Sequence, residues 1–171
     1  MEAIEMGTRL LTEQWIRREY PQLKYVRAHT TGRNAATLYV WNESLELPEA
    51  DAAALKKFAA GCLSSSICYR VKAYSMLQED RVPKDYELPE PVAQAAIDRE
   101  LEPGGVLAVM NGILEPGVVT FNRYDYISGT LHFQLLTDQT VTDIERELAH
   151  RYLSEMIPLG TRCELEYRLA N

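Results

Sequence analysis

The order in which helix-type and strand-type sequence alternate constrains the fold of this chain more than any other feature, because the same order occurs twice. Periodicity indicates a helix, two strands, a helix and a strand over residues 8–20, 23–30, 35–42, 48–63 and 67–74. A helix, two strands, a helix and a strand follow again after residue 91. The pattern predicts an α+β protein of two similar α-β-β-α-β halves, each a small antiparallel sheet covered by helices.

The elements of the first half carry their own start and stop signals. Pro21 ends the first helix, because its ring prevents another helical turn. The two strands meet at a turn in which Gly32 and Asn34 can take a positive φ. Pro48 suits the first position of the second helix, and residues 67–74 alternate as a half-buried strand does. These signals predict a hairpin followed by a helix and a third strand.

The second half begins with one ambiguity. Residues 92–101 read as a short helix, whereas residues 106–114 form an apolar run too short for periodicity to assign. We predict a strand over residues 106–114. Ser128 and Gly129 then suit the turn of a second hairpin.

The end of the chain contains the clearest helix. Residues 140–157 carry an apolar stripe that includes Ile144, and Thr142 with Glu145 forms the sequence of a capping box. Residues 162–170 alternate as a final strand.

A segment rich in proline and charge separates the two halves. Residues 75–91 contain three prolines and seven charged residues without a sustained period, which is typical of a linker. We therefore predict a first α+β half over residues 1–75, a Pro-rich acidic linker over 76–91 and a second α+β half over 92–171.

The order of helices and strands supports an internal repeat better than the residue identities do. At an offset of 93, the stretches that start at Thr37 and Thr130 share only three identities in 27 positions, about what chance gives. The halves are predicted as a pseudo-repeat, and the sequence leaves open whether duplication or convergence produced it.

Composition and cysteine usage indicate the compartment. With 46% hydrophobic and 25% charged residues the chain has the composition of a folded globular protein. Its start is acidic where a signal peptide is basic, and no stretch approaches the ~20 apolar residues of a membrane span. Cys62, Cys68 and Cys163 form no close pair of the C-x-x-C type. We predict a cytoplasmic protein without membrane contact, disulfide framework or metal site.

Charge is distributed unevenly along the chain. The net charge is +2 over residues 1–84 and −9 over residues 85–171. The first part could approach a polyanion, whereas the second would be repelled by one. Acidic and basic parts could equally attract each other within or between chains.

Motifs that mark common enzyme classes are missing from the sequence. It contains no phosphate-binding glycine loop and no nucleophile elbow, so we predict no cofactor and no catalytic residue. Cys62 is expected near a helix C-terminus, where the helix dipole disfavours a thiolate. An enzyme remains as an alternative, with a small-molecule cleft between the halves that could contain His132 with Arg123 or Asp125.

Aromatic and basic residues recur on the predicted strands of the first half at spacings that share faces. If the register aligns these faces, they form one surface of stacking rings and cations. The candidate binding residues are Tyr25, Arg27, Arg33, Tyr39, Trp41, Arg70, Lys72 and Tyr74. A secondary surface is predicted from Tyr124, Tyr126 and His132.

Three functions remain compatible with this surface. Tyrosine, tryptophan and arginine anchor protein interfaces, so we predict a non-enzymatic module that contacts protein or self-associates as a homo-oligomer. The first alternative is single-stranded RNA binding by the basic and aromatic residues of the first half. The enzyme described above is the second. Burial of the aromatic residues beneath the chain itself would remove part of this surface.

Overall fold

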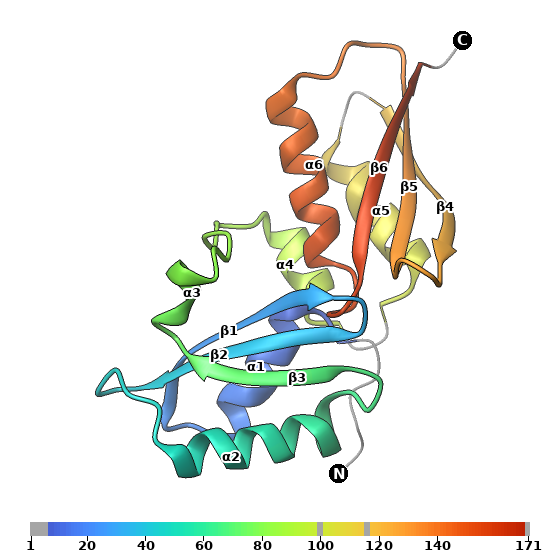
Figure 1. Cartoon of the computed structure of the whole chain (residues 1–171). Helices are drawn as coiled ribbons and strands as arrows, with labels where there is room; N and C mark the ends of the chain where they lie inside the picture. The colour runs from blue at the N-terminus through green and yellow to red at the C-terminus, as the bar shows by residue number, and fades with distance from the viewer. Residues whose placement is uncertain (1–6, 99–100, 115–116, 170–171) are drawn as a thin grey trace. The chain divides into compact units, whose positions relative to one another are not determined.

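The chain divides into two compact units in the computed structural model, which describes residues 7–98, 101–114 and 117–169 (Figure 1). Unit 1 is Met1–Glu87 together with Pro158–Gly160, and unit 2 is Leu88–Ile157 together with Thr161–Asn171. Each unit has its own cluster of buried apolar side chains. The protein is α+β with two similar halves, as predicted.

Unit 1 is a three-stranded sheet with helices. Its elements are α1 (Arg9–Glu19), β1 (Leu23–Gly32), β2 (Ala35–Asn42), α2 (Glu49–Phe58), the π-helical turn η1 (Ala59–Leu63), β3 (Cys68–Ala73) and α3 (Met76–Glu79). The strand order is β1-β2-β3, with β1 and β2 antiparallel and β2 and β3 parallel.

Unit 2 repeats this arrangement. Its elements are α4 (Glu90–Ala96), α5 (Pro103–Ile113), β4 (Gly117–Asp125), β5 (Thr130–Thr137), α6 (Asp143–Glu155) and β6 (Arg162–Leu169). The order is β4-β5-β6, antiparallel and then parallel. The expectation of antiparallel sheets was wrong in this detail. The helix after the second strand returns the chain to the end of the sheet at which that strand began. The third strand of each sheet therefore runs parallel to the second.

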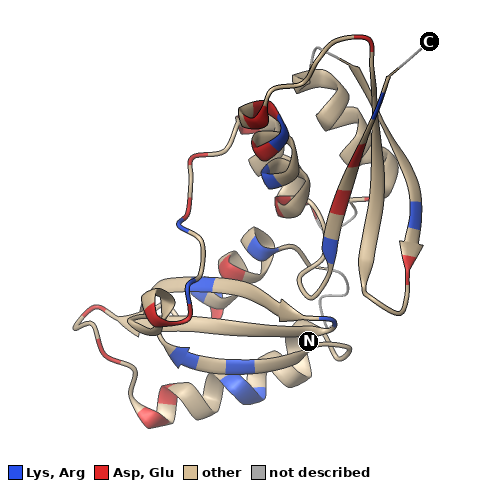
Figure 2. Ribbon diagram, turned by 45° about the horizontal axis from the view of Figure 1, so that its top comes forward, with Lys and Arg blue, Asp and Glu red and all other residues tan. Residues whose placement is uncertain are grey.

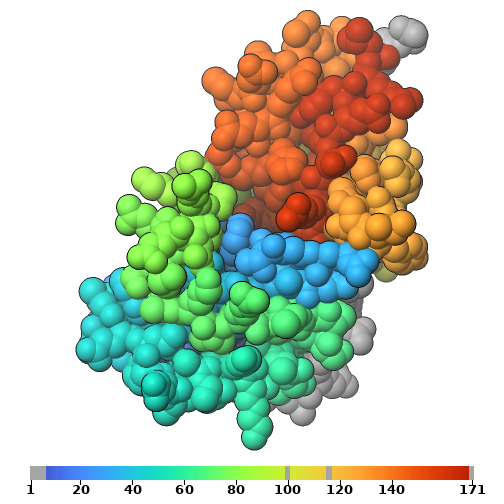
Figure 3. Space-filling view, viewed as in Figure 1, coloured from blue at the N-terminus to red at the C-terminus, as the bar shows by residue number. Residues whose placement is uncertain are grey.

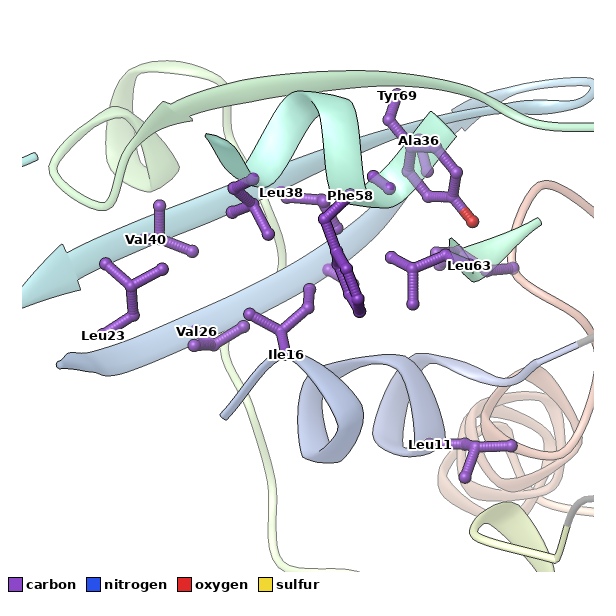
Figure 4. Packing of buried hydrophobic residues seen from close by; sticks show 14 residues of the cluster. Leu11, Ile16, Leu23, Val26, Ala36, Leu38, Val40, Phe58, Leu63 and Tyr69 are labelled. Carbon is purple, nitrogen blue, oxygen red and sulfur yellow. The ribbon is translucent and has the colours of Figure 1, made fainter. Parts of the chain in front are cut away.

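The core of unit 1 lies between one face of its sheet and its helices. Leu38 and Val40 of β2 and Val26 of β1 lie in one cluster with Ile16 of α1 and Phe58 of α2 (Figure 4). Burial of each such large side chain stabilises the folded state by about 1.5–3 kcal/mol. The core therefore fixes which face of this sheet remains for other contacts.

Residues 106–114 are not a strand. Val106 to Ile113 belong to α5, which begins at Pro103 and buries Val106 and Met110, one helical turn apart. The Asn111 side chain bonds the backbone of Val119 on β4, accepting from its N–H at 2.7 Å and donating to its carbonyl at 3.2 Å. The helix thereby supports the sheet.

Other local signals had mixed outcomes. Asn34 has a φ of 52° in the first hairpin, as the turn chemistry predicted, whereas Gly32 does not take a positive φ. The capping box of Thr142 and Glu145 is present at the start of α6. Ile144 was assigned to the buried stripe wrongly, because its side chain is 71% exposed. The predicted helix over residues 92–101 corresponds to α4, and its residues 99 and 100 lie outside the described part of the chain, as does residue 170 of the predicted last strand.

Membrane insertion by a helix finds no support in the described residues. None of their helices is long and apolar enough to cross a bilayer.

Candidate functional site

The register of unit 1 places seven of the eight candidate binding residues on one face of the sheet, opposite the core. Tyr25 pairs with Trp41, Arg27 with Tyr39, and Tyr39 in turn with Lys72 on β3. This surface, which we call the basic–aromatic face, consists of Tyr25, Arg27, Tyr39, Trp41, Arg70, Lys72 and Tyr74. Arg33, the eighth residue, lies in the exposed turn between β1 and β2.

Three rings at one end of this face contact one another. The centroids of Tyr25 and Trp41 are 6.2 Å apart, those of Tyr25 and Tyr74 5.7 Å, and those of Trp41 and Tyr74 5.4 Å. Tyr25 is 43% exposed, and the other two rings are half-buried. We call Tyr25, Trp41 and Tyr74 the aromatic platform. Its rings hold one another in place and still reach solvent, as a preorganised contact surface requires.

The centre of the face is covered, because the residues predicted as the start of the linker lie on it. The Tyr39 hydroxyl donates to Asp80 Oδ2 at 2.7 Å, and Lys72 Nζ donates to the same oxygen at 2.8 Å. Tyr39 is only 1% exposed. Burial, with the hydrogen bond to Asp80, raises the pKa of Tyr39 to about 12. The bonds from Lys72 and Tyr39 lower the pKa of Asp80.

A second carboxylate covers the edge of the face. Asp85 Oδ1 lies 2.8 Å from Arg27 NH1 and 3.0 Å from Arg9 NH2. Arg27 also donates from NH2 to the Pro83 carbonyl at 3.1 Å. Arg9 and Arg27 are both buried, so Asp85 supplies countercharge to cations that have lost most of their water.

Glu13 of α1 completes this charged cluster. Arg9 NH1 donates to both its carboxylate oxygens, at 3.1 and 2.8 Å. Burial raises the pKa of Glu13 to about 7, while the charges of Arg9 and Arg27 act in the opposite direction. Glu13 therefore titrates near neutral pH inside unit 1.

We call residues 75–87 the strap. In Figure 3 the green atoms of this segment lie beside the blue atoms of the sheet. Its only regular element is the single turn α3, and Arg81 next to it has a φ of 56°, which is unusual for a side chain other than glycine. Every residue of the strap is exposed or half-buried.

The remaining row of the face lies beyond these carboxylates. His29 is opposite Thr37, which is opposite the exposed Arg70. Burial is the main cause of a lowered pKa at His29, with Arg27 adding to it. This row contributes one accessible cation, Arg70, at the far end of the face from the aromatic platform.

The three residues of the predicted secondary surface do not share a face. The register shifts between Phe121 and Arg123, which brings Arg123 opposite His132 and Tyr124 opposite Leu131. Tyr124 and Tyr126 contact each other at the end of the hairpin, with ring centroids 5.1 Å apart, and Tyr126 is 80% exposed. His132 lies on the other face.

The groups named for the enzyme alternative have structural partners. His132 Nδ1 is 3.5 Å from Glu164 Oε2 on the neighbouring strand. Asp125 accepts the backbone N–H of Ile127 at 3.0 Å in the hairpin turn. Among the described residues, no group of three or more His, Cys, Asp or Glu side chains could hold a metal ion.

The three cysteines form no disulfide bond with one another. Cys62 is half-buried and Cys68 exposed, and all three thiols are free. Cys163 is buried with its Sγ 3.3 Å from Ser154 Oγ, and burial raises its pKa to about 11. That thiol stays protonated at neutral pH.

Sequence reasoning missed four charged residues at this site: Arg9, Glu13, Asp80 and Asp85. The available signal was the acidic character of residues 76–91 next to a basic strand face. Charge complementarity would have suggested that the two meet.

Comparison of the chain with protein-family models, with curated proteins and with solved structures gives no match. The site is therefore interpreted from its own geometry.

Proposed function

We propose that the protein is a non-enzymatic binding and assembly module that contacts protein through the aromatic platform of unit 1. The observation that carries this proposal is the platform itself, three mutually packed rings that reach solvent on a rigid sheet. Rings held this way lose little conformational entropy on binding, which is why tyrosine and tryptophan anchor protein interfaces.

A protein partner is favoured over single-stranded RNA. Arg27 and Lys72, two of the cations on the basic–aromatic face, already face the carboxylates of Asp85 and Asp80. Nucleic-acid affinity depends on cations that replace counterions along the phosphates, so cations paired within the chain contribute less.

We further propose a second copy of the chain as the partner and the cytoplasm as the compartment. The opposite net charges of the two parts of the sequence favour contact between copies. Three free thiols in a protein of this size suit a reducing environment.

Sedimentation velocity over a concentration series tests the proposal. The wild-type sedimentation coefficient should rise with concentration, and the double substitution Tyr25→Ala with Trp41→Ala should weaken association at least about tenfold, since an anchoring aromatic contributes over ~1 kcal/mol. Ile144→Ala is the matched control, because it removes an exposed apolar side chain in unit 2. Self-association is contradicted by a wild-type coefficient that does not change with concentration.

Anisotropy of a labelled oligouridine tests the RNA alternative on the same proteins. The proposal predicts no salt-sensitive binding that depends on Tyr25 and Trp41. Tight binding that weakens with salt and is lost in the double variant would make RNA the ligand instead.

A further inference from the structure

The strap is attached to unit 1 by charge and not by a core. None of residues 75–87 is fully buried, whereas the sheet residues that it covers, Tyr39 and Arg27, are. Asp80 and Asp85 of the strap contact the sheet through their carboxylates. The side chains of Asp80, Asp85 and Lys72 are partly exposed, so added salt screens the charge in these contacts.

The strap also contains an unfavourable backbone conformation. Arg81, directly after Asp80, has a φ of 56° in the left-handed region. Release of the strap would relieve that conformation. The contacts of Asp80 and Asp85 with their cations must therefore offset its cost while the strap covers the face.

Beneath the strap lies a complete recognition surface. Tyr39 and Lys72 converge on one carboxylate, and Arg9 and Arg27 converge on another. The aromatic platform adjoins the first of these positions, because Trp41 and Tyr74 follow Tyr39 and Lys72 by two residues on their strands.

We propose that the strap is a displaceable cover and that an acidic peptide segment of a partner protein binds beneath it in its place. This inference rests on the proposed function and enlarges its contact surface from the aromatic platform to the whole basic–aromatic face. The strap shows the chemistry of the ligand: carboxylates five residues apart, one for Tyr39 and Lys72 and the other for Arg27 and Arg9.

The geometry favours a peptide over a nucleic acid. Arg27 donates to the main-chain carbonyl of Pro83, between the two carboxylates. A peptide supplies such a carbonyl at the same spacing, and a phosphodiester chain has none. The two carboxylates and this carbonyl together define an extended acidic peptide.

Fluorescence anisotropy with a labelled peptide of the strap sequence, SMLQEDRVPKDYE, tests the proposal on the full chain. In the variant Asp80→Asn with Asp85→Asn the cover is weakened, and the peptide should bind at least tenfold more tightly than to the wild type. The matched control Glu79→Gln with Glu87→Gln removes two strap carboxylates that have no part in these contacts, and it should bind as the wild type does. A peptide with Asn in place of Asp80 and Asp85 should bind neither variant.

The proposal is overturned if the Asp80 and Asp85 variant, folded by circular dichroism, binds the strap peptide no better than the wild type. It is also overturned as to ligand class if that variant prefers oligouridine of equal charge to the peptide. Sedimentation velocity tests the proposed function separately from the displaceable strap. Loss of association in the Tyr25 and Trp41 variant tests the aromatic platform and does not depend on the strap.

Hydrogen exchange of the wild type provides a second test that needs no variant. Amides of residues 75–87 should exchange faster as salt is raised, while those of β2 keep their protection. Strap amides that remain as protected as β2 at high salt would show that the strap is a fixed part of unit 1, contrary to the proposal.

Discussion

In unit 1 the sheet face opposite the core carries rings and cations, and the strap covers its centre, whereas the corresponding face of unit 2 reaches solvent. On β6 that face presents Glu164 and Glu166, whereas β3 presents Arg70 and Lys72 in unit 1. Figure 2 shows acidic bands on the β6 ribbon and basic bands on the β3 ribbon. Val118 and Leu136 on the same face of unit 2 are exposed. One plan thus supports two surfaces, and the side chains on the outer face decide how each is used.

The charged groups of the two units also differ in their burial. In unit 1 the cluster around Arg9, Glu13 and Arg27 is buried, so each partner matters to its neighbours. In unit 2 the pairs of Glu164 with His132 and of Glu166 with Arg168 lie at the surface, where water screens them. Substitutions should therefore have unequal effects in the two units.

The largest expected effect divides the units. Leu38→Ala in β2 and Leu135→Ala in β5 each leave a cavity in one buried cluster and should cost about 2–5 kcal/mol. Calorimetry should show that each change destabilises mainly the unit that contains it. Equal displacement of the whole unfolding profile by either change would indicate a single cooperative core.

The next effect is a pH dependence confined to unit 1. Because the folded-state pKa of Glu13 is raised from 4.5 to about 7, the folded chain holds a proton that the unfolded chain has lost between these values. This bound proton stabilises the folded state by up to about 3 kcal/mol. The stabilisation is complete below pH 4.5 and is lost as pH rises through 7. Urea unfolding at several pH values should show this slope in the wild type. In Glu13→Gln the slope should be absent, and its persistence there would assign it to another group.

A smaller effect is expected from charged pairs, and it should differ between the two units. Asp85→Asn removes the charge that faces two buried arginines and should destabilise unit 1 by about 1–2 kcal/mol, less than a fully buried partner would because Asp85 is 61% exposed. Glu164→Gln in unit 2 should change stability by under about 0.5 kcal/mol. Both are read from denaturant midpoints. Equal losses would remove the distinction drawn between the two faces.

The smallest effect concerns helix caps. Thr8 accepts the N–H of Leu11 at the start of α1, and Thr142 accepts that of Glu145 at the start of α6. Thr8→Ala and Thr142→Ala should each cost about 1 kcal/mol. The cost at Thr8 should be the larger, because Thr8 is buried and the N–H left without its acceptor has less access to water. A larger cost at Thr142 would mean that the reciprocal bond of Glu145 outweighs burial.

Local sequence signals predicted most of the elements of this fold. Pro21, the hairpin turn at Asn34 and the capping box at Thr142 each act within a few residues, and the structure confirms all three. Residues 106–114 were misread because a short apolar run has the same appearance in a buried strand and in a helix. The helix became evident only with Pro103 at its start and Val106 and Met110 buried one turn apart.

The candidate site required contacts that are distant in sequence. Strand alternation placed the rings and cations on shared faces, but Asp85 meets Arg27 across more than fifty residues. The composition of residues 76–91 indicated a linker. Charge and proline content predict how stiff and extended a segment is, but they do not predict which residues it contacts. At Asn122 one extra residue in the strand moved Tyr124 away from His132, and alternation cannot show such a bulge.

Hydroxyl-radical footprinting of the aromatic residues tests the covering of the unit 1 face most directly. In the wild type Tyr25, 43% exposed, should be oxidised at least several-fold faster than Tyr39, 1% exposed, and Asp80→Asn with Asp85→Asn should raise the rate at Tyr39. The control Glu79→Gln with Glu87→Gln should leave both rates unchanged. Oxidation of Tyr39 as fast as that of Tyr25 in the wild type would mean that the strap does not cover the face, and would contradict the account.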